Sequence, residues 1–168
     1  MRSVKVRDLC DPHRSQSVIV HGDDPLEDVL RRFAQETALR GIFVEDDEGR
    51  LLGVITRGDV LEWARLRLGT AFRGPNLDPD RIVRLSQLVR ASLARDAIHP
   101  DSQKAAVQLE DPLDEALRTM LEIDLISLPV VDDAGRIVGE VTVSGVLRML
   151  LDVGDETGPS CAGEAPAT

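Results

Sequence analysis

The stretch GVITRGDVL, at residues 53–61, recurs further along the chain as GEVTVSGVL, at residues 139–147. Both copies carry a leading glycine, a threonine and a closing Val-Leu, but the first has Asp59 where the second has Gly145. A motif that occurs twice in one chain indicates a duplicated structural unit. The fold therefore depends on what surrounds each copy, and the function depends on what Asp59 does.

The duplication extends upstream of this motif. Residues 24–61 align with residues 111–147 with one single-residue gap, and each stretch opens with Asp-Pro. We expect Asp24 and Asp111 to act as N-caps, because Asp accepts hydrogen bonds from the first N–H groups of a helix and proline is tolerated in the first turn. Apolar residues then recur at helical spacing. They are Leu26, Val29, Leu30, Phe33 and Ala34 in the first copy, and Leu113, Ala116, Leu117, Met120 and Leu121 in the second.

Short apolar runs around acidic glycine turns predict three strands in each copy. The turns DDEG and DDAG each separate two apolar runs, a pattern typical of β-hairpins. The expected strands are residues 18–20, 42–44 and 51–55 in the first copy, and 105–109, 128–131 and 137–141 in the second. A second helix follows each hairpin, so the predicted unit is β-α-β-β-α, present twice.

The predicted fold class is α/β, of the α+β kind. A three-stranded sheet cannot bury both of its faces alone, so we expect the two β-α-β-β-α repeats to pack as a pseudo-twofold pair. Residues 2–68 form repeat one, residues 69–80 form a connector that contains glycine and proline, and residues 81–151 form repeat two. Residues 152–168 are small, polar and rich in helix-breaking residues, so we expect them to be disordered.

Composition excludes several classes of protein. The chain has 168 residues, 42% of them hydrophobic, and a formal net charge of −10. That charge and the scattered arginines argue against a nucleic acid partner. No apolar run is long enough to span a membrane and the N-terminus lacks the apolar core of a signal peptide, so we expect a cytoplasmic protein without membrane contact. Cys10 and Cys161 lack metal-ligand spacing, and we expect unpaired thiols.

The repeated unit, the segment ISLPVVDDAGRIVG and the GxxTxxD stretch at residues 53–59 together resemble a tandem pair of cystathionine-β-synthase (CBS) domains, also called a Bateman module. The resemblance covers residues 2–151, nearly the whole chain. It implies a regulatory module that binds AMP, ADP, ATP or an S-adenosyl compound in clefts between the repeats. In such a module GxxTxxD contacts the ribose and phosphate.

The residue chemistry is consistent with that implication. Thr56 and Asp59 lie three residues apart at the expected start of a helix, where unpaired N–H groups favour an anion. A carboxylate can accept two hydrogen bonds from vicinal ribose hydroxyls, Thr56 can donate to a phosphate oxygen, and Arg57 can add a charge-assisted contact. The alternative is a capping box, in which Thr56 and Asp59 only satisfy the helix's own N–H groups. We expect an exposed carboxylate whose cap contributes about 1 kcal/mol.

The resemblance also implies that the adenine ring packs against the partner repeat. The corresponding residues are Leu125 and Ile126, with Val54 beneath the ring, although apolar residues at these positions are also typical of plain core. In the second copy Thr142 keeps the cap, but Gly145 removes the carboxylate and Glu140 introduces a negative charge. The second cleft is therefore expected to be empty, weakly occupied or suited to a less anionic ligand.

Two hypotheses follow for the function. The first is a regulatory, energy-sensing module that binds one adenosine ligand and acts on an unknown effector, without catalytic residues, an obligatory cofactor or a metal site. The second is a ligand-free dimerisation or scaffold module whose clefts have both decayed. Under either hypothesis the broad apolar face of the second helices predicts a homodimer, with Trp63 near an interface. The sequence does not identify the ligand or the effector.

Overall fold

The computed structural model describes residues 4–13, 17–36, 39, 41–71, 73 and 78–151, so the predicted disordered tail lies outside the described residues. Repeat one contains, in chain order, η1 (Val6–Asp8), β1 (Ser17–His21), α1 (Leu26–Gln35), β2 (Gly41–Glu45), β3 (Leu51–Ile55) and α2 (Arg57–Arg67). The helix α3 (Pro79–Arg90) follows. Repeat two contains η2 (Ala94–Ala97), η3 (Ser102–Ala105), β4 (Val107–Gln108), α4 (Leu113–Ile123), β5 (Ser127–Val131), β6 (Ile137–Thr142) and α5 (Val143–Leu151).

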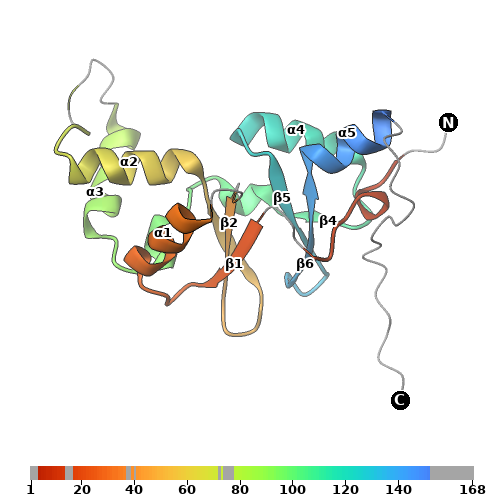
Figure 1. Ribbon diagram of the computed structural model, residues 1–168, viewed down its shortest axis with the longest axis horizontal. Coiled ribbons are helices and arrows are strands. Elements are labelled where there is room, and N and C mark those ends of the chain that lie inside the picture. The colour runs from red at the N-terminus through yellow and green to blue at the C-terminus, as the bar shows by residue number, and fades with distance from the viewer. Residues whose placement is uncertain are drawn as a thin grey trace.

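The described strands form two three-stranded sheets with the same topology. β1 pairs in parallel with β2, and β2 pairs antiparallel with β3; β4, β5 and β6 repeat this arrangement. Figure 1 shows the two sheets in the middle of the molecule, with α1, α2 and α3 on one side and α4 and α5 on the other. The predicted fold class, a mixed α+β pair of β-α-β-β-α repeats, is confirmed.

The opening segment of each repeat packs on the other repeat. In η1, the Val6 N–H donates to the Asp111 carbonyl oxygen at 3.0 Å, so the start of repeat one lies beside the start of α4. In η2, the Ala94 N–H donates to the Asp24 carbonyl oxygen at 2.9 Å, which places the start of repeat two beside α1. This reciprocal exchange means that neither repeat is complete without the other.

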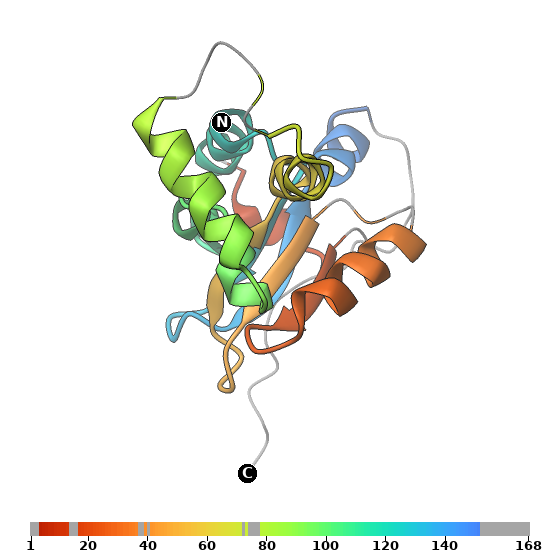
Figure 2. The same ribbon diagram turned by 90° about the vertical axis from the view of Figure 1, so that its left-hand side faces the viewer.

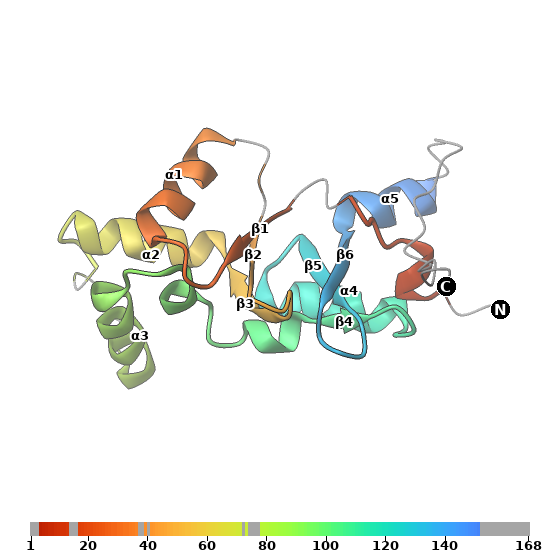
Figure 3. The same cartoon turned by 90° about the horizontal axis from the view of Figure 1, so that it is seen from below.

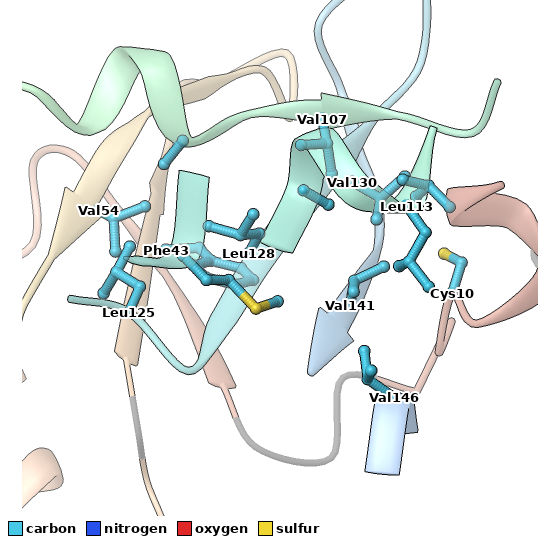
Figure 4. Packing of buried hydrophobic residues seen from close by; sticks show 14 residues of the cluster. Cys10, Phe43, Val54, Val107, Leu113, Leu125, Leu128, Val130, Val141 and Val146 are labelled. Atoms are coloured by element: carbon cyan, nitrogen blue, oxygen red, sulfur yellow. The ribbon is translucent and has the colours of Figure 1, made fainter. Parts of the chain in front are cut away.

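The buried core also crosses the boundary between the repeats. Phe43 from β2 and Val54 from β3 belong to the same buried cluster as Leu125 and Leu128 from repeat two, and Figure 4 shows these four side chains together. A second cluster joins the core of repeat one to Leu88 of α3 and to residues of η2. Both clusters include residues of both repeats. The contact region between the repeats, the seam, therefore consists mainly of buried apolar side chains, interrupted by polar groups.

The helix α3 was not predicted from the sequence. Asp78 caps its N-terminus, where the Asp78 Oδ1 accepts from the Arg81 N–H at 2.8 Å, and Leu85 and Leu88 are buried. In Figures 2 and 3, α2 lies between α1 and α3, so α3 covers the outer side of α2. The helix has no counterpart in the duplicated β-α-β-β-α unit, so the duplication did not predict it.

The Asp-Pro pairs start their helices in a different way from the one expected. Pro25 and Pro112 themselves occupy the N-cap positions, and neither makes a side-chain cap. The Asp24 carboxylate instead accepts from the His21 N–H at 3.0 Å, and the Asp111 carboxylate accepts from the Gln108 N–H at 2.8 Å. The N-cap prediction is therefore wrong, because each carboxylate closes the turn that joins the strand to the helix.

The prediction of unpaired thiols is wrong for Cys10. This residue is fully buried in the shared core and is disulfide-bonded. Cys161 lies outside the described residues.

The two hairpin turns have the same hydrogen-bonding pattern. The Asp46 Oδ1 accepts from the N–H groups of Glu48 and Arg50, both at 2.9 Å, while its Oδ2 accepts from the Arg50 Nε at 3.0 Å. Asp132 makes the equivalent contacts in the second hairpin. In both turns the hydrogen bond from the backbone of the arginine contributes most to lowering the pKa of the aspartate, and the arginine side chain lowers it further.

These lowered pKa values predict acid sensitivity of the hairpins. A carboxylate whose pKa is lower in the folded state stabilises the fold above its unfolded-state pKa, near about 4, and this stability is lost as the pH falls through the folded-state pKa. Amide hydrogen exchange at Arg50 and Arg136 should therefore accelerate relative to the sheet core below about pH 4. In the Asp46→Asn variant the first hairpin should lose this pH dependence while the second keeps it. Equal exchange behaviour of both hairpins in that variant would contradict the assignment.

Candidate functional site

Thr56 and Asp59 form a closed pair at the start of α2. The Asp59 N–H donates to the Thr56 Oγ1 at 3.2 Å, and the Asp59 Oδ2 accepts from the Thr56 N–H at 2.8 Å and from the Thr56 hydroxyl at 2.6 Å. This is a reciprocal capping box. The capping interpretation of the motif is therefore correct as a description of the chain alone.

The second oxygen of Asp59 is bound by an arginine of α3. The Arg84 Nη2 donates to the Asp59 Oδ1 at 2.6 Å, and the side chains are only 16% and 5% exposed respectively. Arg84 also donates to two carbonyl oxygens at the end of η2, those of Ala97 at 2.9 Å and Ile98 at 2.8 Å. One guanidinium group thus connects α2, α3 and the opening segment of repeat two.

Asp59 is therefore not the exposed helix-end carboxylate that the sequence suggested. Its burial and its partners Thr56 and Arg84 make it part of a buried polar network. Sequence reasoning missed Arg84 because α3 itself was missed, and an isolated arginine 25 residues from its partner gives no local signal. Arg57, by contrast, is exposed on the first turn of α2.

Val54 and Leu125, which were expected to flank an adenine ring, belong to one buried cluster that includes residues of both repeats. Both residues are buried in the shared cluster: Val54 is completely buried and Leu125 is 5% exposed (Figure 4). Ile126, the next residue of repeat two, is half-buried. Val54 is further held by polar backbone contacts: its N–H donates to the Ser102 Oγ at 3.0 Å, and its carbonyl oxygen accepts from the His99 N–H at 2.9 Å. The side chains of these two residues are packed as core in this state.

The glycine that leads the repeated motif has a packing role. A Cβ atom on Gly53 would lie 2.3 Å from the Ile98 Cγ2 and 2.6 Å from the Ser102 Oγ, closer than side-chain carbons approach one another. The absence of a side chain at Gly53 therefore lets the opening segment of repeat two lie directly on β3. This contact closes the seam next to the Thr56–Asp59 pair.

The second copy of the motif retains only half of this arrangement. The Gly145 N–H donates to the Thr142 Oγ1 at 3.0 Å, so the threonine cap is kept while the carboxylate is missing. Glu140 is completely buried, and its Oε2 accepts from the Ser127 hydroxyl at 2.6 Å. Its backbone N–H and carbonyl oxygen both pair with Asp11. The Glu140 side chain thus lies in the interior and not on an open surface.

An open cavity of about 700 Å³ is lined in part by Arg84, and Asp59 is not among its lining residues. Three arginines from two segments line it, Arg84 and Arg90 from α3 and Arg95 from η2, together with one carboxylate, Asp96 of η2. Leu52, Ile98 and His99 line the remainder near the seam. Arg95 is paired with Asp23 and is about half exposed. The cavity is therefore basic, in a chain that is acidic as a whole.

Two other kinds of site have no support in the part of the chain that the structure describes. Among the described residues, no group of three or more His, Cys, Asp or Glu side chains could hold a metal ion. Within the same residues, no helix has the length and apolar character to cross a membrane.

Comparisons with known proteins agree with the duplicated architecture. The family model for the CBS domain matches residues 6–65 and 95–152. A CBS domain-containing protein of Dictyostelium discoideum is 29% identical over 141 residues, covering 83% of this chain and 88% of that protein. The chloroplast protein CBSX2 of Arabidopsis thaliana is 27% identical over 164 residues, covering 90% of this chain and 66% of that protein.

Solved structures of similar proteins share the fold. A CBS domain-containing protein of Thermotoga maritima superposes with a TM-score of 0.68 at 25% identity, covering 94% of this chain and all of that one. The cytosolic domain of the Mg²⁺ channel MgtE, solved in complex with ATP, gives a TM-score of 0.57 at 26% identity, covering 88% of this chain and 49% of that one. The two matched repeats, their shared topology and these likenesses establish that the chain belongs to the CBS domain family, with two CBS repeats.

Proposed function

We propose that this protein is a regulatory module that binds one adenosine-containing ligand at the Thr56–Asp59 pair. The observation that carries the proposal is the position of this pair: a carboxylate and a hydroxyl at the start of α2, next to the seam where repeat two lies on β3. In support, the MgtE domain was solved with ATP, and CBSX2 was solved with AMP. The ligand is an AMP, ADP, ATP or S-adenosyl compound.

The proposed contacts follow from the chemistry of each residue. Asp59 accepts from the ribose hydroxyls, and Arg57 adds a charge-assisted contact from the exposed first turn of α2. Thr56 donates to a phosphate oxygen, which requires its hydroxyl to turn away from the Asp59 Oδ2. The adenine ring lies against Leu125 and Ile126, with Val54 beneath it. Because Val54 and Leu125 are packed as core, binding requires the seam to open locally. No catalytic role and no obligatory cofactor is proposed, and the module acts in the cytoplasm on an unidentified effector.

One site per chain is proposed because the two motifs differ. The second motif has Gly145 where the first has Asp59, so no carboxylate is available there for a ribose. The Glu140 carboxyl group, which from the sequence was expected near a ligand phosphate, is buried and accepts from the Ser127 hydroxyl. It is the missing carboxylate, more than repulsion by Glu140, that supports an empty or weak second cleft.

The second candidate function, a ligand-free dimerisation or scaffold module, has an observation of its own in its favour. The Asp59 carboxylate is already satisfied within the chain by Thr56 and Arg84. In addition, several apolar side chains of α2, of its C-cap residue and of α5 are exposed, which is compatible with a protein partner. They are Leu61, Leu68, Leu147, Met149, Leu150 and Leu151.

Thermal melting distinguishes these two functions. An adenosine ligand at about 100 times its dissociation constant adds roughly 2.7 kcal/mol to the free energy of unfolding, which raises the melting temperature of a chain of this size by roughly 5 to 11 °C. A panel of adenosine, AMP, ADP, ATP and S-adenosylmethionine, with GMP as control, should show such a shift for at least one adenosine compound. If none shifts melting at millimolar concentration, the scaffold function is favoured.

The exposed apolar residues of α2 and α5 predict a homodimer. Leu61 and Leu68 are 65% and 76% exposed, and Leu150 is 68% exposed, so covering these residues removes apolar surface from water. Trp63 is half-buried and stacks with Arg67 at 5.1 Å, close to this surface. Light scattering at tens of micromolar protein should report about twice the chain mass of 18.4 kDa. A mass of one chain would contradict the dimer. If the dimer forms through these residues, the Leu61→Glu/Leu150→Glu variant should be monomeric.

A further inference from the structure

We infer that Arg84 controls the affinity of the proposed site by holding the Asp59 carboxylate in the place that the ligand's ribose would take. The inference rests on the proposed function and concerns a residue outside the GxxTxxD motif. Arg84 lies on α3, outside the two stretches, 6–65 and 95–152, that match the CBS domain model, although repeat two was expected from the sequence to begin at residue 81. The ligand therefore has to displace a side chain of the protein itself.

The first step is that both oxygens of the Asp59 carboxylate are already hydrogen-bonded within the chain. Its Oδ2 accepts two hydrogen bonds from Thr56, and its Oδ1 accepts from Arg84 at 2.6 Å. The side chain is only 5% exposed. A ribose can reach Oδ2 only by breaking the capping box, whereas it can reach Oδ1 by replacing one guanidinium contact. Oδ1 is therefore the oxygen that a ligand would use.

The second step is that Arg84 is well held when no ligand is bound. The guanidinium donates to the carbonyl oxygens of Ala97 and Ile98 as well as to Asp59, so leaving Asp59 also disturbs the contact between α3 and η2. Hydrogen bonds that involve charged groups are stronger than neutral ones, and this one is largely shielded from water. The ligand must overcome this interaction before it gains its own.

The third step is that the displaced side chain has somewhere to go. Arg84 lines the basic cavity of about 700 Å³, so its guanidinium can turn into that space without unfolding α3. Arg90, Arg95 and Asp96 line the same cavity, and Arg95 is itself paired with Asp23. The cavity thus permits the release of Asp59, while the contacts of the guanidinium with Asp59 and the two carbonyl oxygens favour the paired state when no ligand is present.

The asymmetry of the chain agrees with this inference. Only the first motif has a carboxylate, and within the described residues only this motif has a helix such as α3 next to it. The contact between Arg84 and Asp59, the Arg84 clamp, therefore occurs at the motif that has a carboxylate.

The test measures adenosine binding by calorimetry, because adenosine is uncharged and cannot use Arg84 as a phosphate partner. Arg84→Met keeps the length of the side chain and removes its charge, and should tighten adenosine binding roughly tenfold to a hundredfold. The matched control is Arg81→Met. Arg81 also joins α3 to α2, through Glu62 at 3.2 Å, but its recorded α2 contact is not Asp59. The control should bind adenosine within about threefold of the wild-type protein.

Circular dichroism first establishes that each variant is folded. If Arg84→Met does not fold, Arg84→Lys replaces it, because a lysine cannot reach all three acceptors and should give a smaller gain in affinity. A second measurement uses the wild-type protein: millimolar adenosine should accelerate amide exchange in residues 79–90, because the ligand releases α3 from Asp59. Protection of α3 by adenosine would overturn the inference.

The outcomes separate this inference from the proposed function. The inference is supported if adenosine binds more tightly to Arg84→Met than to the wild-type protein while Arg81→Met shows no such gain. It is also supported if Arg84→Met binds adenosine measurably and the wild-type protein binds too weakly to measure. Equal or weaker adenosine binding in Arg84→Met overturns it while leaving the site intact, as does an equal gain in Arg81→Met. Weaker AMP binding with unchanged adenosine binding would make Arg84 a phosphate ligand instead. If neither the wild-type protein nor Arg84→Met binds any adenosine compound, both the site and its control by Arg84 are wrong.

Discussion

Replacing Asp59 with alanine should lower the free energy of unfolding by about 2 to 4 kcal/mol. The substitution leaves the Arg84 guanidinium without its anionic partner in a position that is only 16% exposed. Breaking a buried ion pair on one side costs more than the pair itself contributes, because the remaining charge stays poorly solvated. The range is set below that of a fully buried pair, since Arg84 keeps two carbonyl partners and some contact with water. Urea denaturation measures the effect.

A second substitution distinguishes the ion pair from the cap. In the Asp59→Ala/Arg84→Met double variant both charges are absent, so most of the lost stability should return and only the cap contribution of about 1 kcal/mol should remain missing. If the double variant is instead less stable than Asp59→Ala by the full cost of Arg84→Met alone, the two side chains are not energetically coupled. The Arg84 clamp would then lose its physical basis.

Replacing Gly53 with valine should destabilise the protein by about 3 kcal/mol or more. The added Cβ would lie 2.3 Å from Ile98 and 2.6 Å from Ser102, and the two γ-methyl groups would extend further into the same contact. β3 would have to separate from the opening segment of repeat two, which would also weaken the contact between Val54 and His99. Denaturant unfolding measures the loss.

The matched control for this prediction is Gly135→Ala. Gly135 has a positive φ of 79°, so alanine there is strained by its backbone alone, but no atom lies within 4 Å of the added Cβ. The loss should be about 1 kcal/mol. Gly53→Val should therefore be clearly the more damaging of the two. Similar costs for both variants would contradict the close packing of the repeats at Gly53.

The fold was largely predictable because it depends on features that local sequence encodes. Short apolar runs, acidic glycine turns and helical spacing occur twice in the same order, and each of the six expected strands is present in some form. The strand expected at residues 105–109 is reduced to β4 (Val107–Gln108), since Ala105 belongs to η3. The duplication added what local patterns lack, namely which elements belong together. The pairing of two such units then followed from the need to cover small sheets.

Other parts of the fold could not be predicted because they depend on contacts between distant segments. Asp24 was expected to cap α1, but its carboxylate bonds instead to His21, three residues earlier. The exchange of opening segments between the repeats, in which Val6 pairs with Asp111, leaves no mark in either local sequence. The helix α3 lies outside the duplication, so the repeat gave no information about it.

The candidate site was predictable to the same extent. The capping box of Thr56 and Asp59 was predictable because their spacing has a local meaning at a helix start. Val54 and Leu125 lie in one buried cluster, and their contact with a ligand stays a prediction. The burial of Asp59 was not foreseen, because it depends on Arg84, which is distant in the sequence. The burial of Glu140 was also unexpected, because a glutamate in a strand gives no local indication that its side chain will lie in the interior and accept a hydrogen bond from Ser127.

The central claim, a single adenosine site at Asp59, is tested most directly by isothermal titration calorimetry with AMP, ATP and S-adenosylmethionine at up to millimolar concentration. The account predicts saturable binding of at least one of them at about one site per chain. It also predicts that this binding is lost in a folded Asp59→Asn variant and retained in a Ser144→Ala variant, which alters the second motif. Binding at two equal sites, binding that survives in Asp59→Asn, or no binding of any adenosine compound would contradict it.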